Sequence, residues 1–266
     1  MERDFWHKQA IDAPLFPDML WSRPENKRHA GKLLIAGGNL HGFSAPAEAY
    51  GEAMQAGVGV ARVLLPDSLQ KTVGKMFPGA EFGPSTPSGS FAREALGELL
   101  PAAQWADGVL IAGDLGRNSE TAILLESFAK KYSGQISLTS DAADYFIANP
   151  QEILARPDTL LIVSVAQLQK LATNAKFSKP ITFGMDLLHL VETLHEFTVG
   201  HKAYVITRHL GQTFIAVNGQ VSTTKAASTE EPIWRIKTAA KASVWWLQNG
   251  NKPFEALTTS IFDSRR

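Results

Sequence analysis

Residues 28–66 read RHAGKLLIAGGNLHGFSAPAEAYGEAMQAGVGVARVLLP and give the clearest indication of the fold class. Lys32–Ala36 is a short apolar run of the kind that a sheet buries on both faces, and Gly37–Asn39 interrupts it. Ser44–Ala56 suits a helix with small residues along one side, and Val58–Leu65 is a second apolar run. Two parallel strands joined by a helix form a right-handed crossover. The turn after the first strand is where α/β sheets bind ligands.

The composition of the 266 residues narrows the class of protein. Hydrophobic residues make up 44% and charged residues 20%, which is ordinary for a globular protein with a sizeable core. The 26 basic and 26 acidic residues balance, so no net charge draws the chain to nucleic acid or to an anionic membrane. Cysteine is absent, which excludes disulfides, thiol catalysis and cysteine metal ligands. The seven histidines show no metal-binding arrangement.

The N-terminal residues lack the apolar segment of a signal peptide. No apolar run approaches the length of about 20 residues that a membrane helix needs. We therefore expect a cytoplasmic protein with neither a membrane nor a nucleic-acid partner.

Beyond the opening unit, strands and helices alternate, which indicates a mainly parallel sheet covered on both faces. Buried strands are predicted at Gly108–Ala112, Gln135–Thr139 and Leu160–Ser164. Helices are predicted at Asp67–Phe77, Phe91–Trp105, Ser119–Tyr132, Val165–Ala172 and Gly184–Phe197, with turns and a short helix at Asp141–Ala155. We also expect a short helix near Asp4–Ile11 and a loop over Pro78–Gly89.

The pattern changes toward the C-terminus. Three short strands are predicted there, at Ala203–Thr207, Gln212–Val217 and Gln220–Thr224. Asn218-Gly219 predicts a tight hairpin turn between the last two, so the sheet should end in an antiparallel meander. Pro232–Asn249 carries the apolar stripe of one long helix, and a last helix follows from about Pro253. No repeat or linker divides the chain, so residues 1–266 are expected to form one domain.

Four short motifs follow one another in the opening unit: His29-Ala30-Gly31, Gly37-Gly38-Asn39, Ser44-Ala45-Pro46 and Gly57-Val58-Gly59. In this order they resemble the N-terminal pattern of the NAD(P)H-hydrate dehydratases, a branch of the ribokinase-like superfamily. The resemblance covers nearly the whole chain and continues at Val109–Gly116 (VLIAGDLG), Leu138–Asp141 (LTSD) and Leu160–Leu171. It implies a ribokinase-like three-layer α/β/α sandwich with a mainly parallel sheet.

Enzymes of this family repair hydrated NADH or NADPH: they use ATP or ADP to phosphorylate the hydroxyl of the hydrate, and phosphate then leaves. The family supplies an anion hole and a general base from a G-T/S-G-D tetrad at the N-terminus of the long last helix. The resemblance thus implies ATP or ADP and an NAD(P)H-like molecule as ligands. It also implies a homo-oligomer. Of the pair Trp245-Trp246, we expect one residue to lie in the core and the other to be half-exposed or to lie at an interface between copies.

This chain departs from the family pattern at that tetrad. No glycine stands there and a lysine replaces the catalytic aspartate, since the corresponding residues are Trp234, Arg235, Ile236 and Lys237. Glu230 and Glu231 precede them and would repel a phosphate, and Pro232 removes a backbone donor. We therefore expect no retained catalytic residue, which favours a pseudoenzyme or a protein with an altered ligand. The alternatives are an active dehydratase or small-molecule kinase with relocated catalytic residues, and a structural subunit that pairs with an active paralogue.

The resemblance also implies candidate site residues, position by position. The substrate-binding candidates are Gly38, Asn39, His41 and Asp141, and the nucleotide-binding candidates are Gly116, Thr207 and Lys237. Several of them have a simpler explanation. The glycine turn needs no ligand, Asp141 suits a turn or an N-cap, and His41 suits an exposed turn. Lys237 suits a half-buried stem whose amine reaches water.

Overall fold

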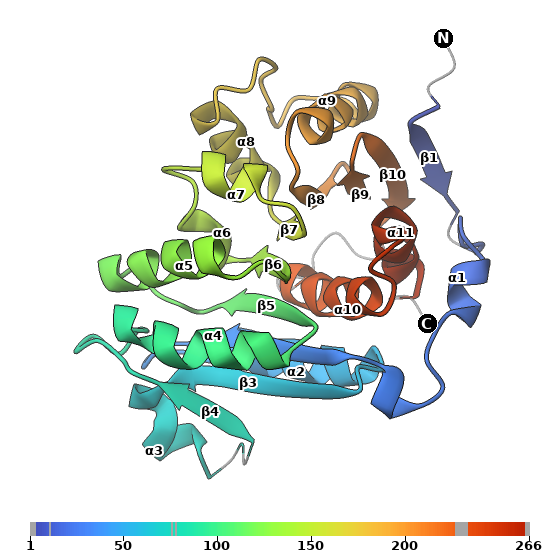
Figure 1. Ribbon diagram of the computed structural model, residues 1–266. Coiled ribbons are helices and arrows are strands. Elements are labelled where there is room, and N and C mark those ends of the chain that lie inside the picture. The colour runs from blue at the N-terminus through green and yellow to red at the C-terminus, as the bar shows by residue number, and fades with distance from the viewer. Residues whose placement is uncertain (1–3, 11, 76, 78, 227–233, 264–266) are drawn as a thin grey trace.

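The computed structural model describes residues 4–10, 12–75, 77, 79–226 and 234–263. Within them, one ten-stranded sheet has the order β1-β10-β9-β8-β7-β6-β5-β2-β3-β4 (Figure 1). In chain order its strands are β1 (Trp6–Gln9), β2 (Lys32–Gly37), β3 (Val60–Pro66), β4 (Ala80–Gly83), β5 (Gly108–Gly113), β6 (Gln135–Thr139), β7 (Thr159–Ile162), β8 (Tyr204–His209), β9 (Gln212–Val217) and β10 (Gln220–Lys225).

The sheet is mainly parallel and ends in an antiparallel meander, as the sequence predicts. Strands β4, β3, β2, β5, β6, β7 and β8 pair in parallel, whereas β9 pairs antiparallel with both β8 and β10. Asn218 and Gly219 connect β9 to β10 with φ angles of 49° and 82°. Left-handed φ values at both positions fit the predicted two-residue hairpin turn, which is therefore confirmed.

Helices cover both faces of the sheet, because alternate residues of each buried strand point to opposite sides (Figure 1). Leu33 and Ile35 of β2 belong to one apolar cluster, and Leu34 and Ala36 belong to the other. The first cluster includes residues of α2 (Ser44–Gln55), α3 (Gln70–Val73), α10 (Trp234–Gln248) and α11 (Pro253–Asp263). The second includes residues of α4 (Leu96–Trp105), α5 (Ser119–Lys131), α6 (Asp141–Asp144), α7 (Gln151–Ala155), α8 (Val165–Asn174) and α9 (Leu187–Gly200). The short helix α1 (Asp18–Trp21) packs against α11. The chain is therefore a three-layer α/β/α sandwich.

Strand β1 shows that the helix expected near Asp4–Ile11 is wrong, although Ile11 itself lies outside the described residues. β1 pairs in parallel with β10. Gln9 Nε2 donates hydrogen bonds to Thr224 Oγ1 at 3.1 Å and to the Thr258 carbonyl at 3.0 Å. These partners lie 215 and 249 residues further along the chain, so the local sequence pattern cannot predict that this segment pairs as a strand.

Two expectations about the segment after β3 are also wrong. The helix expected at Asp67–Phe77 is a 3-10 turn over Asp67–Leu69 followed by the four-residue helix α3. The loop expected over Pro78–Gly89 contains the edge strand β4, which pairs in parallel with β3. β4 has only four residues, which are too few to show the alternation of polar and apolar side chains that identifies a strand.

Helix α10 confirms the predicted long C-terminal helix over its described part. Glu230, Glu231 and Pro232, which the sequence places before it, lie outside the described residues. Trp245 and Trp246 are both fully buried, so neither is the exposed contact expected of an oligomer. Their rings belong to the core beneath α10.

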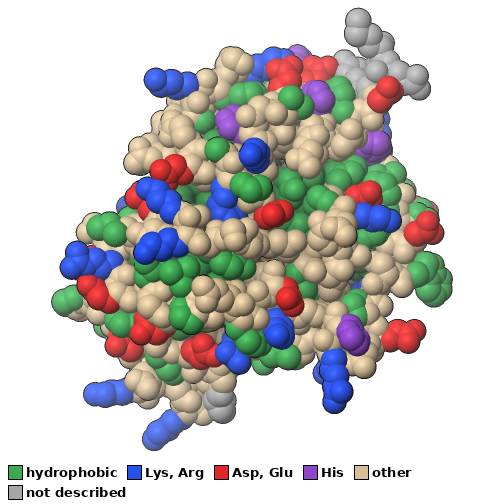
Figure 2. All heavy atoms as spheres, in the orientation of Figure 1, with side chains coloured by type: hydrophobic (Ala, Val, Ile, Leu, Met, Phe, Trp, Pro, Cys, Tyr) green, Lys and Arg blue, Asp and Glu red, His purple; other side chains and the backbone are tan. Residues whose placement is uncertain are grey.

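Charged side chains of both signs are spread over the face shown in Figure 2, with hydrophobic and other side chains between them. This distribution agrees with the formal net charge of 0. Among the described residues, no helix has both the length and the apolar character that crossing a membrane would require.

Candidate functional site

The chain reverses its course across the sheet at β2. From β2 it continues to β3 and β4 on one side, and it then returns to β5 on the other side of β2. The carboxyl ends of β2 and β5 therefore form a topological switch point, where open α/β sheets bind ligands. β2 ends in Gly37 and β5 in Gly113, and the candidates Gly38, Asn39 and Gly116 lie in the loops that follow.

Hydrogen bonds hold the loop after β2 against the loop after β5. The Gly38 amide donates to the Gly113 carbonyl at 2.9 Å, and Asn39 Nδ2 donates to the Asp114 carbonyl at 2.6 Å. Gly38 has a φ of 87°, a conformation that glycine adopts without a steric cost. The structure therefore brings Gly38 and Asn39 to the switch point, whereas the His41 side chain is exposed to solvent.

Asp114 links the two loops to the start of α2. Its Oδ2 accepts hydrogen bonds from the Ala45 amide at 2.7 Å and from Ser44 Oγ at 3.0 Å. A carboxylate is stabilised at this place, because the unpaired amides of a helix N-terminus carry positive potential. Asp114 has a φ of 56°, a left-handed conformation that aspartate tolerates better than most residues. Asp114 thus acts as the anion at the N-terminus of α2.

Asp141 begins α6 directly after β6. Its Oδ2 accepts hydrogen bonds from the amides of Leu115 and Gly116, at 2.9 and 3.1 Å. Its Oδ1 is buried and has no hydrogen-bond partner in the described part of the chain. Burial raises the pKa of Asp141 to about 6. The two amide hydrogen bonds oppose this shift, while the nearby charges of Asp114 and Asp144 add to it.

The backbone beside Asp141 is strained. Ser140 has a φ of 54° and a ψ of −133°, far from the conformations that L residues favour. Gly113 has a φ of 111°, and a Cβ atom there would lie 2.8 Å from Ser140 Cβ and 3.0 Å from Asp141 Oδ1. The ends of β5 and β6 can approach this closely only because residue 113 is glycine. Strained backbone of this kind concentrates at functional sites.

A cavity of about 730 Å³ opens at the carboxyl ends of β5 and β6, beside α5, α6 and α8. Its lining residues are Gly116, Arg117, Asn118, Asp141, Asp144, Tyr145, Ile147, Ala148, Lys170 and Asn174. The Tyr145 hydroxyl donates to the Gly116 carbonyl at 2.7 Å and accepts from the Asn118 amide at 3.2 Å, which fixes one wall. Arg117 and Lys170 are exposed, and neither side chain forms a hydrogen bond or ion pair with another described residue. These two side chains are therefore available to an anionic ligand.

The other nucleotide-binding candidates lie away from this cavity. Thr207 is fully buried in β8, and its hydroxyl has no hydrogen-bond partner among the described residues. Lys237 Nζ, on α10, lies 3.8 Å from Glu52 Oε1 on α2. Gly116 and Asp141 are the candidates that line the cavity.

Arg117, Tyr145 and Lys170 line the cavity without belonging to any motif in the sequence. The position of Arg117 directly after the loop Gly113–Gly116 was the one available signal. Lys170 reaches the cavity because α8 lies near α6, and a single sequence carries no sign of that packing.

The described start of α10 does not supply the phosphate site that the resemblance implies. Its first turn, Trp234–Lys237, contains no glycine for close approach of a phosphate and no carboxylate to accept a proton. Arg235 Nη1 donates instead to Gln167 Oε1 at 2.9 Å, and Gln167 is part of the capping box of α8. Among the described residues, no three His, Asp and Glu side chains are grouped as ligands of a metal ion.

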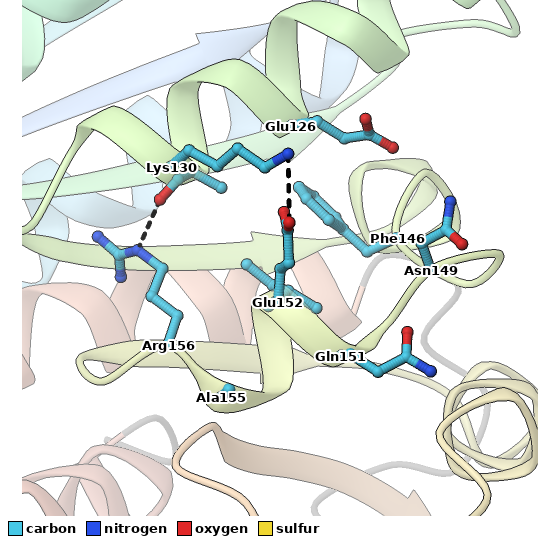
Figure 3. A pocket seen from close by; sticks show the side chains of 10 residues that line it. Glu126, Lys130, Phe146, Asn149, Gln151, Glu152, Ala155 and Arg156 are labelled. Atoms are coloured by element: carbon cyan, nitrogen blue, oxygen red, sulfur yellow. Dashed lines mark hydrogen bonds and ion pairs between the residues drawn. The ribbon is translucent and has the colours of Figure 1, made fainter.

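A second pocket, of about 550 Å³, lies between α5 and α7, near the amino ends of β6 and β7 (Figure 3). Lys130 Nζ is 3.2 Å from Glu152 Oε1 across it. Arg156 Nε donates to the Ala129 carbonyl at 3.2 Å (Figure 3). The guanidinium of Arg156 also donates to the carbonyls of Tyr132, Gly134, Pro157 and Asp158 and to Thr159 Oγ1. The two cations of this pocket, Lys130 and Arg156, are thus bound to groups of the protein itself.

The sequence matches no protein-family model and no curated protein. Solved structures do match. A ribokinase-like superfamily protein of Enterococcus faecalis has a TM-score of 0.73 and 14% identity, over 98% of this chain and 87% of that chain. A hypothetical protein of Streptococcus mutans has a TM-score of 0.67 and 16% identity, over 92% of this chain and 87% of that chain.

The ADP/ATP-dependent NAD(P)H-hydrate dehydratase of Bacillus subtilis, co-crystallised with ATP/Mg²⁺, is also similar. Its TM-score is 0.64 at 12% identity, over 94% of this chain and 87% of that chain. At such low identity, these likenesses show the fold alone. The chain therefore has the ribokinase-like α/β fold that the resemblance in its sequence implies.

Proposed function

We propose that this chain binds a small molecule in the cavity at the carboxyl ends of β5 and β6, and that it lacks the phosphoryl-transfer chemistry of the dehydratases it resembles. The observation that carries the proposal is the described first turn of α10, Trp234–Lys237, which has neither a glycine nor a carboxylate. The chemistry needs a base that takes a proton from the hydroxyl of the substrate. An ammonium group has no lone pair with which to accept that proton, and Lys237 lies beside Glu52 instead.

The cavity supports the binding half of the proposal. Its volume of about 730 Å³ falls within the range of about 300–1,000 Å³ that is usual for small-molecule sites. Arg117 and Lys170 present cations on its exposed side, and Ile147 and Ala148 add apolar surface. Such a lining suits a nucleotide-like ligand with an anionic group and an uncharged part.

Further properties that the resemblance implies belong to the same proposal. The ligand class is ATP, ADP or an NAD(P)H-like molecule, by analogy with the Bacillus subtilis enzyme that was co-crystallised with ATP/Mg²⁺. The protein acts in the cytoplasm, as a homo-oligomer of single-domain chains, without a nucleic-acid or membrane partner.

Turnover tests the catalytic half of the proposal. Purified protein is incubated with hydrated NADH and either ATP or ADP, and the recovery of NADH is followed by its absorbance. No turnover above the rate without protein is expected. Clear turnover with either nucleotide would contradict the proposal.

Thermal shifts test the binding half. At least one of ATP, ADP, NADH and NADPH should raise the melting temperature, since a ligand at about 100 times its dissociation constant adds roughly 2.7 kcal/mol. The double variant Arg117→Ser/Lys170→Ser should lose the shift. Lys130→Ser, in the amino-end pocket, is the matched control and should keep it. If all four ligands fail at millimolar concentration, the binding half is wrong.

One observation favours a second candidate function, an active dehydratase or kinase with a relocated base. Asp141 lines the cavity, and its pKa is raised to about 6 by burial. A carboxylate with a pKa near the operating pH is suited to proton transfer. Under this candidate, hydrated NADH is turned over, Asp141→Asn abolishes turnover, and the distant carboxylate variant Asp186→Asn does not.

A further inference from the structure

We infer that Asp114 and Asp141 are internal anions, which occupy the donors at the switch point that would otherwise receive a phosphate. The cavity therefore takes ligands that place no anionic group against these donors. This inference rests on the proposed function, because it specifies the chemistry of the ligand at that site.

The first occupied site is the N-terminus of α2. Ala45 donates its amide and Ser44 its hydroxyl to the same oxygen of Asp114, at 2.7 and 3.0 Å. A helix N-terminus with a neighbouring hydroxyl is a favourable anion site in α/β proteins. Here the protein's own carboxylate fills it.

The second occupied site is the loop after β5. The consecutive amides of Leu115 and Gly116 converge on Oδ2 of Asp141, at 2.9 and 3.1 Å. Convergent backbone amides of this kind form anion-binding concavities. Asp141 comes from the end of the neighbouring strand β6, so packing of β6 beside β5 is enough to fill this site.

Four further amides of the loop after β2 also donate within the protein. Each donates to a nearby acceptor: Gly38 to the Gly113 carbonyl, Asn39 to the Gly42 carbonyl, Leu40 to the Gly89 carbonyl and His41 to Asn39 Oδ1. A phosphate brought to this loop, beside the cavity, would displace one of these contacts and approach the carboxylates of Asp114 and Asp141. Arg117 and Lys170, which have no partner in the part of the chain that the structure describes, are the favourable place for an anionic group of the ligand.

Binding of inorganic phosphate tests this inference without knowledge of the natural ligand. Calorimetric titrations compare the wild-type chain with Asp114→Gly and Asp141→Ala at constant ionic strength. Glycine suits the φ of 56° at residue 114, so Asp114→Gly removes the carboxylate without adding backbone strain. Glu48→Gln is the matched control, because it changes the charge of an exposed residue on α2 by the same amount and frees no amide.

Asp114→Gly and Asp141→Ala should each bind phosphate about tenfold more tightly than the wild-type chain, and Glu48→Gln should bind it like the wild-type chain. A factor of ten corresponds to about 1.4 kcal/mol, the strength of one hydrogen bond to a charged group. If Asp141→Ala does not fold, Asp114→Gly decides alone.

Phosphate affinity that is equal in the wild-type chain, Asp114→Gly and Glu48→Gln would overturn the inference. Turnover of hydrated NADH by the wild-type chain would instead overturn the proposed function. The two failures are distinguishable, because the phosphate titration needs neither ATP nor hydrated NADH.

Discussion

The cavities at the two ends of the central strands are similar in size, about 730 Å³ at the carboxyl end and about 550 Å³ at the amino end, but they use their charges differently. At the amino end, Lys130 is paired with Glu152, and Arg156 is bound to backbone carbonyls. At the carboxyl end, Arg117 and Lys170 have no such partner among the described residues. Volume alone therefore does not identify a ligand site. A ligand site is better identified by cationic side chains that lack a hydrogen-bond or ion-pair partner among the described residues and that lie near strained backbone.

The largest effect should come from Arg156→Met at the amino end. The substitution leaves partly buried backbone carbonyls without their charged donor, which should lower the free energy of unfolding by about 3 kcal/mol. Urea denaturation measures the loss. Arg156→Lys should recover only part of it, because an ammonium group cannot span several carbonyls as a guanidinium does. Ligand-induced thermal shifts should persist in both variants, and their disappearance would show that the amino-end pocket takes part in ligand binding.

Gly113→Ala should have the next largest effect, at the carboxyl end. Its Cβ would meet Ser140 Cβ at 2.8 Å, and its φ of 111° is unfavourable for alanine. We expect a loss of about 2 kcal/mol in the free energy of unfolding together with weaker ligand binding. Gly97→Ala in α4 is the control, because a Cβ there meets nothing within 4 Å. An unaltered stability of Gly113→Ala would show that the ends of β5 and β6 are not tightly fixed.

The pH dependence of stability should report Asp141. Its pKa rises from the ordinary 3.8 to about 6 in the folded chain, so the folded state binds the proton more tightly than the unfolded state. The contribution of this proton binding to the free energy of unfolding is complete below about pH 4 and is lost as the pH rises through 6. Because Asp141 is partly exposed, we expect a loss of about 1.5 kcal/mol across this window. The urea midpoint of the wild-type chain should fall as the pH rises from 4.5 to 7.5, and that of Asp141→Asn should fall less steeply. An equal slope in the two chains would contradict the raised pKa of Asp141.

Lys130→Ala should have the smallest effect. Lys130 and Glu152 are both largely exposed, and exposed ion pairs contribute about 0–1 kcal/mol. We expect a change of at most about 0.5 kcal/mol in stability and none in ligand binding. A loss of ligand binding in this variant would move the candidate site to the amino end of the strands.

Much of the fold follows from local patterns. The strands β5 and β7 are short, mostly apolar runs between turn residues, and the opening unit from Lys32 to Pro66 shows its crossover directly. The misassigned strands lack that local signal. β1 takes its partners from segments more than 200 residues away, and β4 is too short to show a period.

The candidate site follows the same rule. Gly116 and Asp141 could be predicted because motifs at the ends of β5 and β6 carry them. The contact between Asp114 and Ala45 could not, since it depends on how two loops meet in space. Lys170 belongs to the cavity through the packing of α8, which a single sequence does not reveal.

The pairing of β1 with β10 bears on the order in which the chain folds. Trp6 and Thr223 are joined by a hydrogen bond across a separation of 217 residues, so β1 can pair only after β10 has been synthesised. Contacts of such separation form late, because closing so long a loop costs entropy before it gains contacts. Until then, the outer side of β10 offers unpaired backbone groups to any other chain. β1 thus covers the outer side of β10 and becomes the edge strand of the sheet in its place.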